Sequence, residues 1–576
     1  MRLFTAFIFI TFGVAFAQEQ TVGVFNNEPS AYNGYTLFNV FQSPTTYLID
    51  NCGKKVYEWT SSNGGPAASV YLLGDGNLLR TYNPGNTSFV FGGAGGGIEL
   101  LDPNSNIIWQ YELNSDTTLS HHDLEVLPNG NILIMAIELI SAEEANNNGS
   151  ITDADRYSEM ILELNPSTQE IVWQWRAWDH LVQDIDPSLP NFGIISENPE
   201  KIDINYAFLQ DGSDPDWLHF NSIDYNIDLD QIIVSCPEFG EFWIIDHSTT
   251  TQESSSSSGG FSGKGGDILY RWGNPEAYGR GDSLDRVFEY QHDAHWITTS
   301  GQDEGKIMVF NNGDIRGYSS IDVLIPPLDT SNFNNYHLTN NSTPYGPNNL
   351  DWSYLDSANF FSHRISGAQR LPNGNTLICS GIQGRIFEIE RGSDLVVWDY
   401  IVPVNNQSGP VTQGTPPLTN RVFRAHKFSP SYSGFDNLNI SPSSVIELNP
   451  LSSNCEIYVT GCTDPTALNY NVDANYNNGS CEYNVVDNPC DTIYNQSVGA
   501  GNLAICNSAQ LNVDESFTML IDPTFFNPSI DGIIEWSYYC NSSDEGELIS
   551  VWTYDSIINN TITDIHCSNQ IDSTER

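Results

Sequence analysis

Three histidines stand in similar settings along the chain, each shortly before polar turn residues and an apolar strand. They are His122 in HHDLEVLPNGNILI, His219 in HFNSIDYNIDLDQIIVS and His292 in HDAHWITTSGQDEGKIMVF. Near neutral pH an imidazole can be a nucleophile, a proton carrier or a hydrogen-bond donor. Three of them at one place would suit holding a compact anion while one ring nitrogen reacts.

A repeated phrase is the reason to expect that these histidines meet. LPNGN occurs at 127–131 and at 371–375, with a degenerate copy, LGDGN, at 73–77. A turn-and-strand unit that repeats around a closed array brings equivalent positions to one place. The residues that this alignment places at the start of the repeats, facing a shared channel, are His122, His219 or Asn221, His292, Ser366, and Arg424 or His426.

A second repeat predicts the architecture. Short strands with an aromatic residue at the same register recur around Trp59, Trp109, Trp173, Tyr270, Trp352 and Trp398. Helical periodicity is nearly absent, and Gly, Asn, Asp and Pro separate short β-branched and aromatic runs. We therefore predict an all-β, six-bladed β-propeller over residues 18–452, with the aromatic side chains packed between neighbouring blades.

Two further segments concern the closure and the mouth of such a propeller. SSVIELNP at 443–450 could complete a blade begun at the N-terminus, which would tie residues 18–50 to residues 440–450. The serine and glycine tract at 253–266 predicts a flexible loop, and a lid over the channel mouth is the alternative.

The charge and the first residues narrow the choice of partners and location. The 576 residues carry 72 acidic and 21 basic side chains, a formal net charge of -51. Such a surface repels phosphate backbones, which argues against nucleic acid, and any anion site must be a local exception. Residues 1–17 read as a cleavable secretory signal, and no later segment is long enough to span a membrane. We expect a secreted, periplasmic or cell-surface protein.

The cysteines predict small modules after the propeller, at 453–482 and 483–576, the second β-rich and without an assigned role. Seven of the ten cysteines lie from Cys455 onward, which favours disulfides there, with Cys462 and Cys481 as the preferred pair. Free or buried thiols are expected at Cys52, Cys236 and Cys379. The oxygen ligands that calcium prefers are offered in the first module by Asp464, Asn471, Asp473 or Asn475.

Other roles for the histidines are metal binding and structure. Histidines from separate blades could bind zinc or copper without leaving a short spacing motif in the sequence. The histidines outside the repeats are predicted to be hydrogen-bonded structural residues: His180, His247, His337 and His566.

The chain is similar to bacterial arylsulfate sulfotransferases over about residues 20–450. The likeness is densest in SHHDLEVLPNGNILI, DWLHFNSIDYN, FWIIDHSTT, LYRWGNPEAYGRGDSLDRVFEYQHDAHWI and GAQRLPNGNTLI. The resemblance implies a six-bladed propeller that moves a sulfuryl group from an aryl sulfate to a small phenolic acceptor. It further implies a ping-pong mechanism through a sulfated histidine, with no cofactor required for catalysis.

The resemblance also implies roles for single residues. His292 matches the nucleophile, His122 and His219 the supporting histidines, Asn221 an amide contact and Ser366 a hydroxyl contact. An arginine that the family places after the HxN strand falls near Pro237, so sulfuryl binding would need a replacement from Arg271, Arg364 or Arg424.

Two functions of other classes compete with this reading. A propeller could bind an extracellular glycan or sulfated polymer without turnover, and the missing arginine favours that alternative. A metal- or quinone-dependent oxidoreductase is the third, although no dedicated ligand motif supports it.

Overall fold

The structure is a computed structural model that describes residues 19–206, 214–332, 335–338, 340, 342–452 and 454–483. It also describes four short strands, β34 (Ser516–Phe517), β35 (Ile533–Ile534), β36 (Trp552–Thr553) and β37 (Ile565–His566). The predicted signal at 1–17 and nearly all of the module predicted for 483–576 lie outside the described residues. The chain divides into two compact units, Met1–Thr460 and Gly461–Arg576. No helix in the described ranges has the length and apolar character that a membrane span needs.

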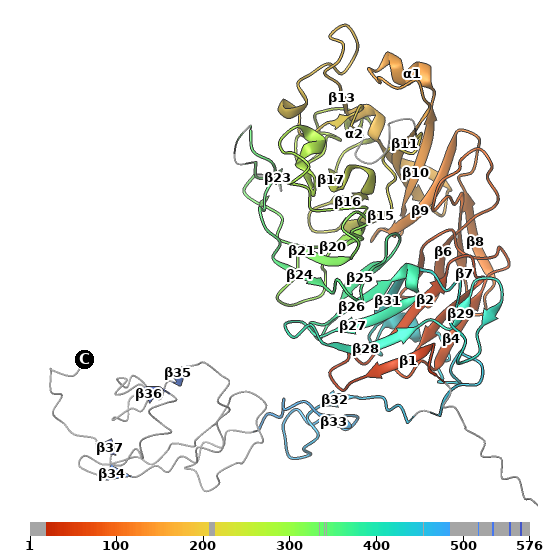
Figure 1. The fold of residues 1–576 in the computed structure, drawn as a ribbon, viewed down its shortest axis with the longest axis vertical. Coiled ribbons are helices and arrows are strands. Elements are labelled where there is room, and N and C mark those ends of the chain that lie inside the picture. Colours follow the sequence, from red (N-terminus) through yellow and green to blue (C-terminus); the bar gives the residue numbers. More distant parts are fainter. Residues whose placement is uncertain are drawn as a thin grey trace, which may run out of the picture. The chain divides into compact units, whose positions relative to one another are not determined.

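Six antiparallel sheets form the first unit as the blades of a propeller (Figure 1), which confirms the predicted fold class. From the inner strand outward, three blades are β31 (Val422–Phe428), β2 (Tyr35–Val40), β3 (Thr45–Ile49), β4 (Lys55–Thr60); β5 (Val70–Leu72), β6 (Leu78–Tyr82), β7 (Gly97–Leu101), β8 (Ile107–Glu112); and β9 (Thr118–Val126), β10 (Ile132–Ile140), β11 (Arg156–Asn165), β12 (Glu170–Arg176).

The other three blades follow in chain order. They are β15 (Ser222–Asn226), β16 (Gln231–Cys236), β17 (Glu241–Asp246), β18 (Tyr270–Trp272); β19 (His292–Trp296), β20 (Ile307–Asn311), β21 (Ser320–Leu324), β24 (Trp352–Leu355); and β25 (Gly367–Arg370), β26 (Thr376–Ser380), β27 (Arg385–Ile389), β28 (Val396–Ile401) with β1 (Gly23–Asn27) as a fifth strand. The inner strands β9, β15, β19, β25 and β31 each contact the next one in this order, so residues at their starts share one end of the channel.

The LPNGN phrase forms the turn between the first two strands of a blade. Leu127 donates its N–H to the carbonyl of Asn131 at 2.9 Å, and Gly130 donates to the carbonyl of Leu127 at 2.8 Å. The copies at 371–375 and 73–77 make the same pair of hydrogen bonds. Gly130 has a φ of 85°, a conformation that favours glycine, so this residue specifies the turn.

The predicted aromatic repeat lies in the outermost of the four repeated strands of every blade. Its members are Trp59 in β4, Trp109 in β8, Trp173 in β12, Tyr270 in β18, Trp352 in β24 and Trp398 in β28. Trp109 donates its indole N–H to the carbonyl of Pro166, on the next blade, at 2.9 Å. Tyr270 packs among residues of the following blade, including Ile307. The prediction that these rings pack between blades is confirmed.

The ring closes through an inner strand, not through the segment that was predicted. Strand β31 pairs antiparallel with β2, with Leu37 opposite His426, so late and early parts of the chain share one blade. The predicted closing segment, 443–450, forms no strand of that blade and makes isolated bridges instead, Val445 with Lys54 at the blade edge and Leu448 with Thr412. Strand β31 makes its backbone hydrogen bonds along the free edge of β2, whereas 443–450 lies beside Lys54 and Lys55 at the opposite edge of the blade.

The disulfides confirm one prediction and correct another. Cys462 and Cys481 are bonded, as predicted. Cys52 is not a free thiol, because it is bonded to Cys455 across a sequence separation of 403 residues. Closure of the ring brings these two cysteines together, and sequence spacing gives no sign of it. Cys236 and Cys379 are buried thiols, as expected.

The candidate calcium ligands of the module at 453–482 are engaged in local hydrogen bonds. Asp464 accepts hydrogen bonds from Thr466 at 2.9 and 2.8 Å and from the Tyr483 hydroxyl at 2.8 Å. Asn471 accepts one from the N–H of Asp473 at 3.1 Å. The described residues contain no group of three His, Cys, Asp or Glu side chains arranged for a metal ion. Calcium binding stays a prediction.

The serine and glycine tract is fixed against the outside of a blade. It begins with α2 (Thr251–Ser254), whose capping box is complete. Trp175 donates to the carbonyl of Gly266 at 2.7 Å, and the His180 ring bonds the carbonyl of Ser254 at 2.8 Å. None of its residues lines the cavity described below, so the lid alternative is wrong and the flexible-loop prediction is corrected. His180 is structural, as predicted, whereas the side chain of His337 is exposed, which corrects the prediction of a structural role for that residue.

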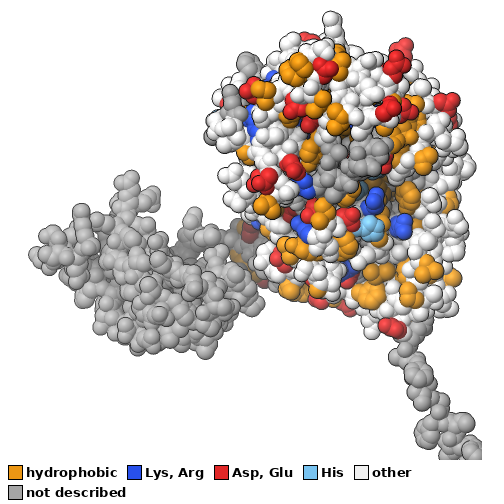
Figure 2. Space-filling view, turned by 45° about the horizontal axis from the view of Figure 1, so that its top comes forward, with side chains coloured by type: hydrophobic (Ala, Val, Ile, Leu, Met, Phe, Trp, Pro, Cys, Tyr) orange, Lys and Arg blue, Asp and Glu red, His pale blue; other side chains and the backbone are white. Residues whose placement is uncertain are grey.

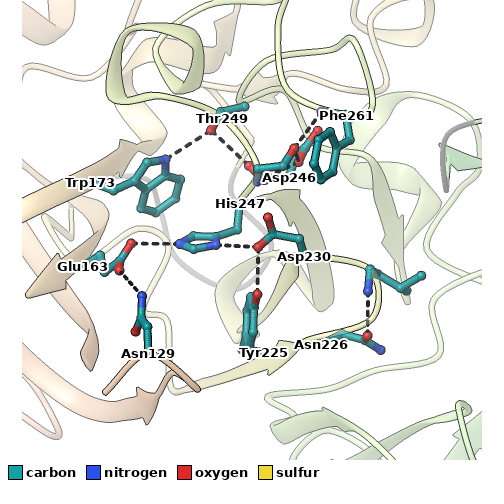
Figure 3. A network of polar contacts seen from close by, with 12 residues as sticks. Asn129, Glu163, Trp173, Tyr225, Asn226, Asp230, Asp246, His247, Thr249 and Phe261 are labelled. Atoms are coloured by element: carbon teal, nitrogen blue, oxygen red, sulfur yellow. Dashed lines mark hydrogen bonds and ion pairs between the residues drawn. The ribbon is translucent and has the colours of Figure 1, made fainter. Parts of the chain in front are cut away.

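His247 is a second structural histidine, and it links two blades (Figure 3). Its Nε2 lies 3.1 Å from Glu163 on β11, and its Nδ1 lies 2.7 Å from Asp230 in the turn before β16. The Trp173 ring packs edge to face at 4.9 Å. Burial acts to lower the pKa of His247, but the two carboxylates raise it to about 9.

Replacing His247 with glutamine should therefore destabilise the propeller in a pH-dependent way. A pKa raised above the unfolded value of about 6.5 gives stability that is complete below about pH 6.5 and is lost as pH rises through 9. We expect His247→Gln to lower the free energy of unfolding by roughly 1 to 3 kcal/mol at about pH 6 and by much less at about pH 10. Denaturant titrations at both pH values, with exposed His337→Gln as the control, measure this; equal losses at both would contradict it.

Candidate active site

A cavity of about 380 Å³ lies where the six inner strands begin. Every blade contributes a residue in, or just before, its inner strand: Ala68, His122, His219, His292, Ile365 and Arg421. A volume of this size is typical of pockets that hold small organic ligands. Of the positions that the repeat predicts, His122, His219 and His292 line this cavity, whereas Asn221, Ser366, Arg424 and His426 do not.

The cavity brings the three predicted histidines together. The rings of His122 and His219 lie edge to face with centroids 4.8 Å apart, and His292 lines the same space. Phe91 packs beside them, 6.0 Å from the ring of His219. Figure 2 shows a histidine flanked by basic side chains within a hollow on this face of the propeller.

His292 offers one unprotonated ring nitrogen to this site. The side-chain amide of Asn312 donates to the carbonyls of Ser362 at 2.7 Å and Ile365 at 2.9 Å, so its oxygen must face the other way. That oxygen lies 2.8 Å from Nδ1 of His292 and accepts its hydrogen. Nε2 then carries the lone pair, and it accepts a hydrogen bond from the Ile365 N–H at 3.2 Å.

The surroundings of His292 keep its ring neutral. Burial lowers the pKa of His292 to about 3; the hydrogen bond to Asn312 opposes this shift and the charge of His219 adds to it. A neutral imidazole with its lone pair on Nε2 is the nucleophilic form of histidine.

His219, in contrast, is held as a cation. Its Nδ1 lies 2.6 Å from a carboxylate oxygen of Asp216, three residues earlier. Burial acts to lower the pKa of His219, but Asp216, Glu238 and Glu159 raise it to about 9. An imidazolium beside the neutral His292 can hold an anionic group or stabilise a leaving oxygen.

His122 lies within β9 with a φ of 44° and places its ring against Gly93. A Cβ at Gly93 would come within 2.1 Å of Nε2 of His122, so only glycine fits there. Burial lowers the pKa of His122 well below its usual value, and the charges of His219 and His121 add to this. His122 is therefore neutral near neutral pH and can exchange a proton with a ligand.

Two arginines at the cavity have no polar partner for their guanidinium groups among the described residues. Arg364 and Arg421 are exposed and line the cavity, and Arg364 packs 5.7 Å over the ring of Tyr290. Each other arginine in the described ranges donates a side-chain hydrogen bond or forms an ion pair. In a protein of net charge -51, these two groups are the local exception that an anion site needs.

Comparison with known proteins identifies the family of the chain. A sequence model of the family described as Arylsulfotransferase (ASST) matches residues 21–409. The chain belongs to this family. No curated protein shows a significant match to this chain.

Solved structures resemble this arylsulfotransferase family member only weakly. A protein of unknown function from Bacteroides caccae is 13% identical, with 69% of this chain and 99% of that chain covered and a TM-score of 0.38. A putative 6-phosphogluconolactonase from Bacteroides fragilis is 9% identical, with 69% and 98% covered and a TM-score of 0.34. Virginiamycin B lyase from Staphylococcus aureus is 12% identical, with 67% and 90% covered and a TM-score of 0.30. At these TM-scores the likenesses carry no argument about function.

Two residues that the resemblance to arylsulfotransferases assigns to the substrate lie behind the cavity wall. The Asn221 side chain is buried and donates to the carbonyl of Gln291 at 2.8 Å. The Ser366 hydroxyl donates to Ser362 at 2.8 Å and accepts from the N–H of Gly381 at 3.0 Å. Both side chains hold neighbouring strands in place, and the expected contacts with substrate are corrected accordingly.

Two of the arginines suggested as sulfuryl ligands form ion pairs with buried carboxylates instead. Arg424 lies between Asp123 and Asp293, with nitrogen to oxygen distances of 2.9 Å to each. Arg271 is on β18, the outer strand of its blade, where it pairs with Glu241 and is fully buried. Neither arginine lines the cavity. Arg271 is remote from the channel because its strand is the outermost of the blade. Arg424 is held beneath the cavity wall by its two aspartates.

The position of the missing family arginine is part of the cavity. Pro237 lines it together with Glu238, and Asp214 and Asp216 also lie in the lining. An acidic group of residues and the basic Arg364 therefore share one cavity. Of the three suggested replacements for the arginine, Arg364 is the one in the lining.

Several lining or supporting residues carry no signal in the repeat. They are Asp216, Asn312, Tyr290 and Arg421. A weak signal exists for two of them, because Asp216 stands in the DWLHFN motif and Arg421 directly precedes the inner strand β31.

Proposed function

We propose that this protein transfers a sulfuryl group from an aryl sulfate to a phenolic acceptor through a sulfated His292. One observation supports this most: the Asn312 amide fixes the hydrogen of His292 on Nδ1 and leaves the lone pair of Nε2 at the cavity. Membership of the arylsulfotransferase family supports the same class of reaction.

The first half-reaction forms a bond between Nε2 of His292 and sulfur. The sulfur to phenol-oxygen bond breaks as this bond forms, and the ring keeps its Nδ1 hydrogen on Asn312. A donor must displace the Ile365 N–H that now bonds Nε2 at 3.2 Å, and this N–H would then face a sulfuryl oxygen. In the second half-reaction the oxygen of a second phenol attacks sulfur and the bond to Nε2 breaks.

Charged and aromatic residues of the cavity have different roles in this mechanism. The imidazolium of His219 lies beside the nucleophile and would stabilise the negative charge that gathers on the transferred group. Aromatic residues Phe91, Tyr290 and Phe423 line the cavity and offer contacts for an aryl ring.

An extracellular or periplasmic site of action belongs to the same proposal. The disulfides Cys52–Cys455 and Cys462–Cys481 are of a kind that persists in oxidising compartments. They support export, as does the signal-like sequence at 1–17.

A half-reaction experiment tests the proposal. Without acceptor, the purified protein mixed with 4-nitrophenyl sulfate should release about one equivalent of 4-nitrophenol in a burst, and the peptide with His292 should gain the mass of one sulfuryl group. Added phenol should restart turnover and remove the adduct. Binding of sulfated polymer with no burst and no adduct would favour the non-catalytic alternative and overturn the proposal.

The two free arginines give a separate prediction. Arg364→Gln and Arg421→Gln should each raise KM for 4-nitrophenyl sulfate by roughly three- to tenfold, because each removes a cation from the donor's path. The effect should shrink at high salt, since exposed charges are screened. Lys55→Gln, which removes a half-buried cation paired with Glu58 and outside the cavity lining, is the control. An unchanged KM at low salt would show that these arginines do not meet the donor.

A further inference from the structure

A buried carboxylate and a second histidine lie directly behind His122. Nδ1 of His121 is 2.9 Å from Nδ1 of His122, and Nε2 of His121 is 2.9 Å from Oε2 of Glu159. The side chains of His121 and Glu159 have no exposed surface. The other oxygen of Glu159 accepts the N–H of Phe220 at 2.7 Å, which fixes the carboxylate. A continuous chain thus runs from Glu159 through two imidazoles to the cavity.

This chain has two hydrogen-bond states, because two Nδ1 atoms in contact must share one hydrogen. When His121 is neutral, its Nε2–H faces Glu159 and its Nδ1 accepts from His122, whose Nε2 is then a base. When His121 is a cation, it donates to Nδ1 of His122, whose Nε2 then carries a hydrogen. The protonation state of the buried pair therefore decides whether His122 is a base or an acid.

The charges around the chain favour a proton on His121 over one on His122. The groups that face His122 are His219, His121, His292 and Arg424, none of them a carboxylate. His121 faces the carboxylate of Glu159, and burial raises the pKa of Glu159 while His121 opposes that shift. A cation is therefore better placed on His121, beside the Glu159 carboxylate, than on His122.

We propose that His121 and Glu159 are positioning residues: His121 passes a proton to and from His122 during each sulfuryl transfer, and Glu159 holds His121 in place for this step. The proposal rests on the proposed function. In the first half-reaction the leaving phenolate takes the hydrogen from Nε2 of His122, while Nδ1 of His122 takes one from the cationic His121. In the second half-reaction the acceptor phenol returns a proton to Nε2 of His122, and Nδ1 of His122 returns one to His121. Protons balance over the cycle, and no other reactant is needed.

The test compares two donors in Glu159→Gln. 4-Nitrophenolate leaves readily without a proton, whereas phenolate, the weaker leaving group, needs one. We expect Glu159→Gln to lower kcat/KM for phenyl sulfate by about 10²-fold or more and for 4-nitrophenyl sulfate by less than about fivefold. A wholly structural role would lower both values by the same factor, and that result would overturn the proposal.

Matched variants separate the outcomes. Glu163→Gln changes another glutamate of β11, one that bonds His247 and not the site, and it should leave the ratio of the two donors unchanged. If Glu159→Gln does not fold, His121→Gln is measured in the same way, and an unchanged ratio there overturns the proposal. A wild-type protein that releases no 4-nitrophenol would instead overturn the proposed function itself.

Discussion

Replacing His292 with glutamine should lower sulfuryl transfer from 4-nitrophenyl sulfate to phenol by at least about 10⁴-fold. Glutamine can keep a hydrogen bond to Asn312 but has no ring nitrogen that could form the covalent intermediate. The measurement is kcat/KM, together with loss of the mass increase on the peptide that holds residue 292. The loss is expected in kcat, because the arginines and His219 would still bind the donor.

An exposed histidine provides the control for this experiment. His337→Gln removes a side chain that lies outside the cavity lining and should leave kcat/KM within about twofold of wild type. Retention of more than about a tenth of the wild-type rate in His292→Gln would contradict covalent catalysis by this residue.

Asp216→Asn should produce the second largest loss, roughly 10²- to 10³-fold in kcat at about pH 7.5. Asp216 is the carboxylate that contributes most to raising the pKa of His219, which reaches about 9 with Glu238 and Glu159 against the effect of burial. Without the carboxylate, the pKa of His219 falls and its ring is neutral at that pH. The variant should keep the shape of the cavity, because asparagine has nearly the same size and can still accept the Nδ1 hydrogen.

The pH profile identifies the charge as the cause. In the wild type, kcat/KM should be lost as pH rises through about 9, where His219 gives up its proton. In Asp216→Asn this alkaline decline should move to lower pH, so that activity recovers in part on acidification. A profile that keeps its decline near 9 in the variant would show that His219 is not the titrating group.

The fold could be predicted from the sequence because its signals are local. The glycine of LPNGN specifies a turn at positive φ, and each aromatic of the second repeat lies on the outer strand of a blade. Six repeats of such a unit can bury their faces only against one another. The location of His122, His219 and His292 on one cavity followed from the same register.

The parts that could not be predicted depend on contacts between distant segments. Asn312 reaches His292 from the end of a neighbouring strand, and the disulfide of Cys52 joins residues 403 apart. Ser366 stands at the expected position, but its hydroxyl turns to Ser362 and Gly381 and not to the cavity. Register predicts where a backbone lies, whereas contacts with residues of neighbouring strands and loops decide where a side chain points.

The bond between Cys52 and Cys455 also determines how the propeller would carry a mechanical load. Cys455 precedes the unit that begins at Gly461, and Cys52 lies between β3 and β4. Tension that arrives along the chain from that unit therefore enters the blade through a covalent bond at Cys52. This tension does not break the hydrogen bonds between β31 and β2. Arg421, which directly precedes β31 and lines the cavity, therefore bears none of the force.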